Sequence, residues 1–176
     1  MTSIYRESIH FIGPSEQISL IPAQLETESF LGKEWLHIPC EHGQNCGPIE
    51  EITSSTFRIS VFVRLDGSSL DYYFECLSDA FPSLLILGSS YCPYMGYLEF
   101  RAWFGGEPKF SESMHFSGYK MPIMPNASNP EVPIFTEIRK SMSDVLVAAE
   151  VSFASGCKTP RKALRILERV KADWDS

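Results

Sequence analysis

Two histidines and two cysteines lie close together between residues 37 and 46 of this 176-residue chain, at His37, Cys40, His42 and Cys46. Imidazole nitrogen and thiolate sulfur are the atoms that bind tetrahedral zinc, and the neighbouring glycines and prolines let a loop wrap an ion. Zinc ligands usually come as Cys-x-x-Cys with a second pair further along, and the spacing here matches no common finger. The segment is therefore interpreted either as a zinc site or as an ordinary loop, and no other cofactor is expected.

The same segment offers a cysteine nucleophile, Cys40 or Cys46. Its base would be one of four histidines, namely His42, His37, His10 or His115. A nucleophile also needs a third, orienting group and an oxyanion site, which the sequence does not identify. A metal- or cysteine-dependent hydrolase built on residues 37–46 is thus the enzymatic alternative. The common nucleotide-binding and serine-hydrolase motifs are absent from the sequence.

Charge is spread unevenly along the chain, whose net charge is −7. Residues 1–56 hold two bases against eight acids, a net charge of −6, whereas residues 157–176 hold six bases against three acids, a net charge of +3. An acidic surface repels nucleic acid and attracts basic partners. We therefore expect a basic protein as partner and no direct contact with nucleic acid.

The elements that must position these residues begin with strands. Residues 8–12 form a short β candidate before Gly13-Pro14, and a short helix is expected after Ser15. Residues 56–64 alternate apolar and polar side chains, which predicts a strand. A helix over 70–81, a strand over 84–87 and a strand over 96–104 follow, with residues 91–96 as a hairpin connection.

Two helices are predicted at the C-terminal end. The first begins at Pro133 and stops at Gly156, and the second has Thr159 as N-cap and Pro160 at its first position. The predicted fold class is α+β, an antiparallel ferredoxin-like sheet with the two C-terminal helices packed on it. We expect one domain over 1–176, with a sheet-rich part at 1–120, a proline-rich crossing loop at 121–133 and a helical hairpin at 134–176.

Basic residues gather on the outer face of the last helix, at Arg161, Lys162, Arg165, Arg169 and Lys171. These residues, or Arg58, Arg64 and Arg101 beside Tyr97 and Trp103 on the sheet, could contact nucleic-acid phosphates. Because the net charge opposes such binding, we favour an intramolecular role. The prediction is that the basic face docks on the chain's own acidic front end.

Two stretches resemble the YubB-like ferredoxin-fold proteins of phages and conjugative plasmids. They are Ser8-Ile-His-Phe-Ile-Gly-Pro-Ser-Glu-Gln-Ile, and Leu77-Ser-Asp-Ala-Phe-Pro-Ser-Leu-Leu-Ile-Leu with the later Trp103-Phe-Gly-Gly-Glu. The resemblance covers about the first 107 residues, and the chain lacks the Trp-Cys-Asn opening of that family. It implies a mobile-element origin and a ferredoxin-like sheet, and it implies no catalytic residues.

Taken together, these patterns predict an acidic, non-enzymatic inhibitor that occupies the binding surface of a basic nucleic-acid-handling protein, of the anti-CRISPR or toxin-immunity type. The expected contact residues are acids with aromatic anchors: Glu26, Glu28, Glu34, Trp35, Glu41, Glu50, Glu51 and Tyr94. A monomer or a dimer is expected.

The expected location is the cytoplasm. No apolar run approaches the roughly 20 residues of a membrane helix, so no membrane contact is expected. The first residues lack the pattern of a secretion signal. An odd number of cysteines, five, also favours reduced thiols.

Overall fold

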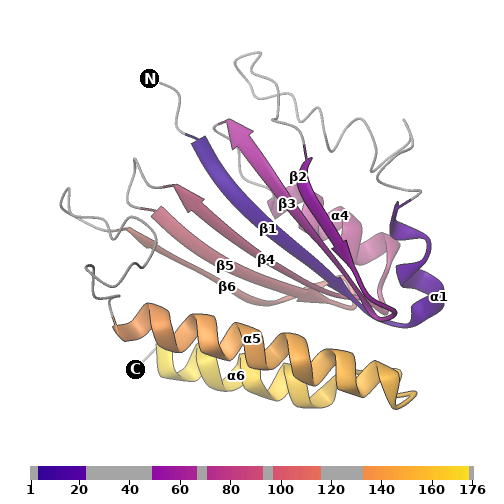
Figure 1. Ribbon diagram of the computed structural model, residues 1–176. Coiled ribbons are helices and arrows are strands. Elements are labelled where there is room, and N and C mark those ends of the chain that lie inside the picture. The colour runs from indigo at the N-terminus through magenta and orange to yellow at the C-terminus, as the bar shows by residue number, and fades with distance from the viewer. Residues whose placement is uncertain (1–3, 23–48, 67–70, 93–96, 116–132, 175–176) are drawn as a thin grey trace.

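The computed structural model describes residues 4–22, 49–66, 71–92, 97–115 and 133–174. An antiparallel sheet of six strands crosses the molecule in the spatial order β2-β3-β1-β4-β5-β6, with the strands curving together across Figure 1. The strands are β1 (Ile4–Ile12), β2 (Ile49–Ser54), β3 (Arg58–Asp66), β4 (Leu85–Cys92), β5 (Tyr97–Phe104) and β6 (Glu107–His115).

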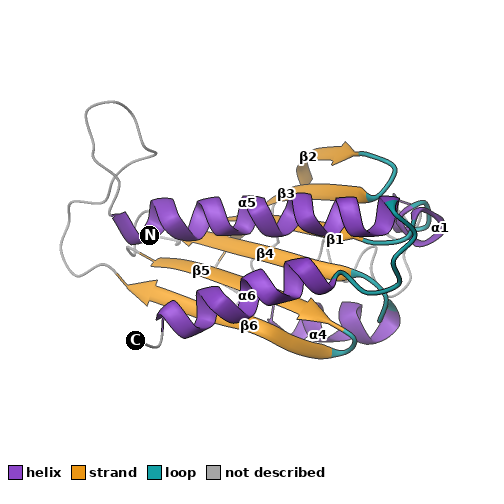
Figure 2. Ribbon diagram, turned by 90° about the horizontal axis from the view of Figure 1, so that it is seen from below, coloured by secondary structure: helices purple, strands orange, loops and turns teal. Residues whose placement is uncertain are grey.

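Helices cover both faces of this sheet. One face holds α1 (Ser15–Ile18) and α4 (Asp71–Ala80), and the other holds α5 (Pro133–Ala154) and α6 (Arg161–Trp174). Seen from below, α5 and α6 lie side by side, with α5 nearer β1 and α6 nearer β6 (Figure 2). The fold class is thus α+β with an antiparallel sheet, and both C-terminal helices pack on one face of it.

Strand alternation sends neighbouring side chains into two different cores. On β1, Ile9 and Phe11 face α1 and α4, where Val61 of β3 and Ile86 of β4 join them. Ile12 faces the opposite way and belongs to the core under α5 and α6. The central strands are therefore buried on both sides.

The core under the C-terminal helices is built from apolar residues at helical spacing on α5 and α6. Val145, Ala149 and Phe153 of α5 pack with Ala163 and Leu167 of α6. After α5, Gly156 has φ +76°, and the Cys157 amide donates to the Ser152 carbonyl at 3.0 Å. This is the glycine-terminated helix end that the sequence indicates. The start of α6 lies one residue later than expected, because the Leu164 amide donates to the Pro160 carbonyl, which makes Pro160 the N-cap.

Several strands differ from the sequence prediction. β1 and β4 are longer than the apolar runs that indicated them, and β2 and β6, the two ends of the described sheet, were not expected at all. A side chain on an edge strand meets fewer neighbours than one on a central strand, so edge strands tolerate polar residues on both faces. The sequences of β2 and β6 therefore carry little apolar alternation.

A glycine in β4 makes room for an aromatic side chain of α4. A Cβ atom at Gly88 would lie 2.3 Å from the ring tip of Phe74, which is 1% exposed. Gly88 pairs with Ile9 on one side and Arg101 on the other. The missing side chain lets the Phe74 ring settle on the sheet, and Arg101 then lies 5.3 Å from the ring centroid.

Replacing this glycine is expected to destabilise the fold. Gly88→Ala should lower the free energy of unfolding by about 1–3 kcal/mol, since a buried ring has to move to admit a methyl group. The measurement is urea denaturation followed by circular dichroism. Phe74→Leu removes the ring that clashes, so Gly88→Ala should cost less in that background than in the wild type. Equal costs in both backgrounds would contradict this account of the contact.

Candidate functional site

Most of the residues that the sequence singled out lie outside the described part of the chain. They include all four possible zinc ligands, and they are Glu26, Glu28, Glu34, Trp35, His37, Cys40, Glu41, His42, Cys46 and Tyr94. Both the zinc prediction and the cysteine-nucleophile prediction therefore remain predictions. Within the described residues, no group of three histidine, cysteine or acidic side chains is arranged to hold a metal ion.

Two of the predicted contact residues, Glu50 and Glu51, lie on β2. Among the described strands, β2 pairs with β3 alone and forms one end of the described sheet. The pairing shifts register between Ile49 and Glu51, an irregularity of the bulge type. The structure thus places two adjacent acids on an edge strand.

Polar side chains meet across the centre of the sheet on the face that α5 covers. His10 of β1 pairs with Ser60 of β3, and its Nδ1 lies 2.7 Å from the Ser60 Oγ. Ser8 of β1 pairs with Ser89 of β4, and their hydroxyl oxygens are also 2.7 Å apart. These two cross-strand hydrogen bonds satisfy polar groups between helix and sheet.

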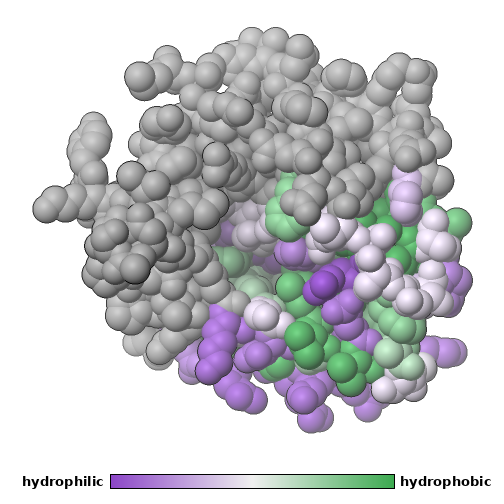
Figure 3. Space-filling model, in the orientation of Figure 1, coloured by the Kyte–Doolittle hydropathy of each residue, from purple (hydrophilic) through white to green (hydrophobic). Residues whose placement is uncertain are grey.

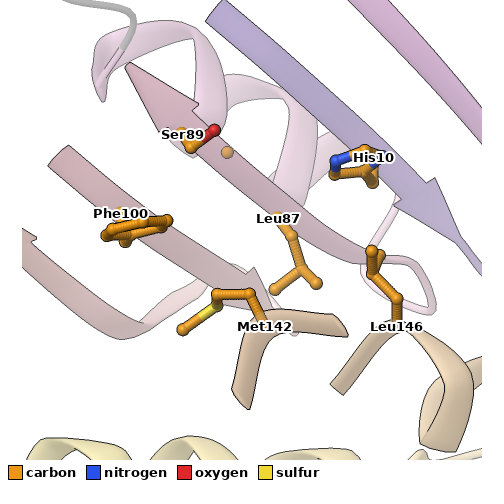
Figure 4. Close-up of a pocket in the computed structure, with 7 residues that line it drawn as sticks. His10, Leu87, Ser89, Phe100, Met142 and Leu146 are labelled. Carbon is orange, nitrogen blue, oxygen red and sulfur yellow. The ribbon is translucent and has the colours of Figure 1, made fainter. Parts of the chain in front are cut away.

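A small cavity adjoins these hydrogen bonds. It has a volume of about 50 Å³ and lies between β1, β4, β5 and α5. Figure 4 shows His10, Ser89 and Leu87 on the sheet side, with Met142 and Leu146 of α5 below them. A site of this size holds a few water molecules, whereas a cavity that binds benzene measures about 150 Å³.

The environment of His10 disfavours its charged form. Burial, and to a smaller extent the nearby positive charge of Arg58, together lower the pKa of His10 from 6.5 to about 4. The imidazole is therefore neutral at physiological pH. Its partner Ser60 is 3% exposed, so a substrate has little access to that hydroxyl. The pair is suited to joining strands, and its geometry does not favour a nucleophile with its base.

A buried ion pair occupies the opposite face of the sheet. Arg101 donates to the Glu99 carboxylate through its Nη2, and both side chains are buried. Arg101, named above among the residues that could contact phosphates, does not present its charge to solvent, because α4 covers that face and the Phe74 ring packs against the guanidinium. The predicted helix at 70–81 could have indicated this burial, because an amphipathic helix has to pack its apolar side against a face of the sheet.

The basic face of α6 points to solvent. Lys158 before the helix and Arg161, Lys162, Arg165, Arg169 and Lys171 in it are all exposed, and none of them forms an ion pair with another described residue. The predicted docking of this face on the chain's own acidic front end is thus not observed among the described residues. α6 packs instead at the β6 end of the sheet.

Comparison with known protein families, curated proteins and solved structures finds no match to this chain. None of the described helices is both long enough and apolar enough to cross a bilayer.

Protonation of His10 should destabilise the protein in mildly acidic solution. Between pH 6.5 and pH 4, His10 binds a proton in the unfolded chain and not in the folded one, so the free energy of unfolding falls as the pH falls. The loss from this residue should amount to about 2–3 kcal/mol across that interval. Urea denaturation at a series of pH values measures it.

His10→Asn is the matched control, because an amide in place of Nδ1 can still hydrogen-bond Ser60 and does not titrate. Its stability should change less than that of the wild type over the same pH interval. Parallel pH profiles for the two proteins would show that His10 has the same pKa in the folded and unfolded chain, which would contradict the lowered pKa.

Proposed function

We propose that this protein is a cytosolic, non-enzymatic inhibitor that docks on a basic, nucleic-acid-handling protein. The acidic β2 edge, defined here as β2 with Glu50 and Glu51, forms part of the contact surface. The target is of the type that anti-CRISPR or toxin-immunity proteins inhibit. Carboxylates take the place of phosphates on the cationic surface of the target, which then no longer binds its nucleic acid.

The position of β2 at the end of the described sheet supports this function most directly. An edge strand leaves one row of backbone N–H and C=O groups without a strand partner, and such edges are a recurring place for protein recognition. Adjacent glutamates hinder pairing between two identical β2 edges, because like charges would then face each other. The same glutamates favour an approaching basic surface.

The surrounding charge supports the same partner class. Residues 1–56 carry a net charge of −6, and both β1 and β2 fall within that stretch. Charge of one sign steers an oppositely charged partner and raises its association rate. The acidic sequence around Glu50 and Glu51 would therefore guide encounter as well as contact.

The fold is proposed to be a ferredoxin-like unit with additions. Among the described elements, the first six, β1, α1, β2, β3, α4 and β4, follow the β-α-β-β-α-β order of that fold. β5, β6 and the two C-terminal helices extend it. The resemblance to YubB-like proteins of phages and plasmids fits this arrangement and supports a mobile-element origin.

Charge reversal on β2 tests the proposed function. Tagged wild type, Glu50→Lys/Glu51→Lys and Glu75→Lys/Asp79→Lys are used to capture proteins from host lysate at about 50 mM and about 500 mM NaCl. The control pair lies on α4, is exposed, and changes the net charge by the same amount. We expect one basic protein to be retained at low salt by the wild type and by the control.

The retained protein is then purified and its binding to a labelled DNA or RNA is followed by fluorescence anisotropy. The wild type and the control should displace the nucleic acid, while the β2 variant should need at least about tenfold more protein to do so. Retention of no basic protein, equal inhibition by all three proteins, or a captured protein that still binds its nucleic acid would each overturn the proposal.

A further inference from the structure

The outer face of α6 is an exposed basic surface without a partner inside the described part of the chain. We call it the α6 basic face and define it by Arg161, Lys162, Arg165 and Arg169. The helix rises 1.5 Å per residue, so Arg161, Arg165 and Arg169 follow each other at intervals of about 6 Å along one side. Ala163 and Leu167, on the other side, are fully buried. The packing of the core therefore fixes the direction of these cations.

Exposed apolar side chains flank this basic surface. Val147 and Val151 of α5 are 56% and 60% exposed, more than any other large apolar side chain among the described residues. They are four residues apart, on the side of α5 that faces away from Val145 and Ala149. Figure 3 shows hydrophobic side chains open to solvent over α5, next to hydrophilic ones at the lower rim of the molecule. The surface thus combines cations with apolar area that a partner would cover.

The chain's own acidic β2 edge cannot neutralise the α6 basic face within one molecule. β2 and β6 are the two ends of the described sheet, five strand spacings apart, which is about 24 Å. α6 packs at the β6 end, and α5 lies between it and the β2 end (Figure 2). At physiological salt the Debye length is about 8 Å, so attraction over this distance is screened. A second molecule can bring the two surfaces into contact.

We propose that the α6 basic face of one copy of this protein docks on the acidic β2 edge of a second copy. The contact is head to tail, since two different surfaces meet, and a pair of copies therefore keeps one free acidic β2 edge and one free α6 basic face, to which further copies can add. Opposite charges come within ion-pair distance across the contact, and Val147 and Val151 contribute apolar area beside them. A second copy carries the same net charge of −7, so the contact depends on the local match between the α6 basic face and the acidic β2 edge and not on the overall charge.

This inference goes beyond the proposed function and is tested on the purified protein alone, so that either can fail without the other. Because both use the β2 edge, a basic target would compete with the second copy. Light scattering after size exclusion measures the mass at about 20 mM and about 500 mM NaCl. One chain has a mass of 19.9 kDa. We expect a mass that rises with protein concentration at low salt and returns to that of one chain at high salt.

Two charge-reversed variants then separate the two surfaces. Arg165→Glu/Arg169→Glu removes the basic face, and Glu50→Lys/Glu51→Lys removes the acidic edge, so each alone should keep the mass of one chain at low salt. Mixed in equal amounts at low salt, they should associate, because the intact α6 basic face of one variant can dock on the intact acidic β2 edge of the other. Lys109→Glu/Lys140→Glu, which makes the same charge change outside α6, should associate like the wild type.

Three results would overturn the proposal. The wild type could keep the mass of one chain at low salt, the α6 variant could associate as well as the wild type, or the mixture of the two variants could fail to form a complex. A wild type of single-chain mass that shifts only when a short oligonucleotide is added would assign the α6 basic face to nucleic acid and would also overturn it.

Discussion

Because helices cover both faces of the sheet, each central strand has to fill two separate cores with alternate residues. β1 shows the constraint most clearly, since Ile9 and Phe11 enter the core under α1 and α4 while Ile12 enters the core under α5 and α6. A slip of one residue against β3 or β4 would exchange the two sets of side chains. The register of the sheet is thus determined by both cores together, and the edges and outer helix faces remain open to other roles.

Polar residues within this arrangement occur in matched sets. His10 and Ser60 join two strands on one face, and Glu99 and Arg101 pair on the other. A buried ion pair adds little net stability compared with apolar residues of the same size, but the loss of one partner is costly. The absence of a side chain at Gly88 permits the Phe74 ring to shield the guanidinium. These groups therefore specify one packing of the sheet more than they strengthen it.

Sequence patterns predicted the elements with strong periodicity and missed those without it. The alternation of β3 and the apolar stripes of α5 and α6 each determine a buried face, so their positions followed from the residues alone. β2 and β6 were missed because an edge strand needs no apolar alternation. The side of the sheet that α4 covers was also missed, and with it the burial of Arg101. Local periodicity reports that a face is buried, whereas the identity of the covering element depends on distant parts of the chain.

For the candidate sites, spacing alone singled out the segment from 37 to 46 and could not foresee the His10–Ser60 pair, whose members come from different strands.

The central place of the first strand has a consequence for how the protein is made. Ile9 has as its neighbours Val61 and Gly88, so β1, the first of the described strands to be synthesised, waits for partners that come much later in the chain. Until β3 has been synthesised both edges of β1 are unpaired, and until β4 has been synthesised one edge still is, which favours aggregation of the nascent chain. Sheets whose contacts join distant parts of the sequence also fold slowly, in milliseconds to seconds. The chain loses loop-closure entropy before the stabilising contacts between distant strands form. Early steps of folding would therefore be sensitive to the speed of translation and to chaperones that hold the emerging N-terminal strand.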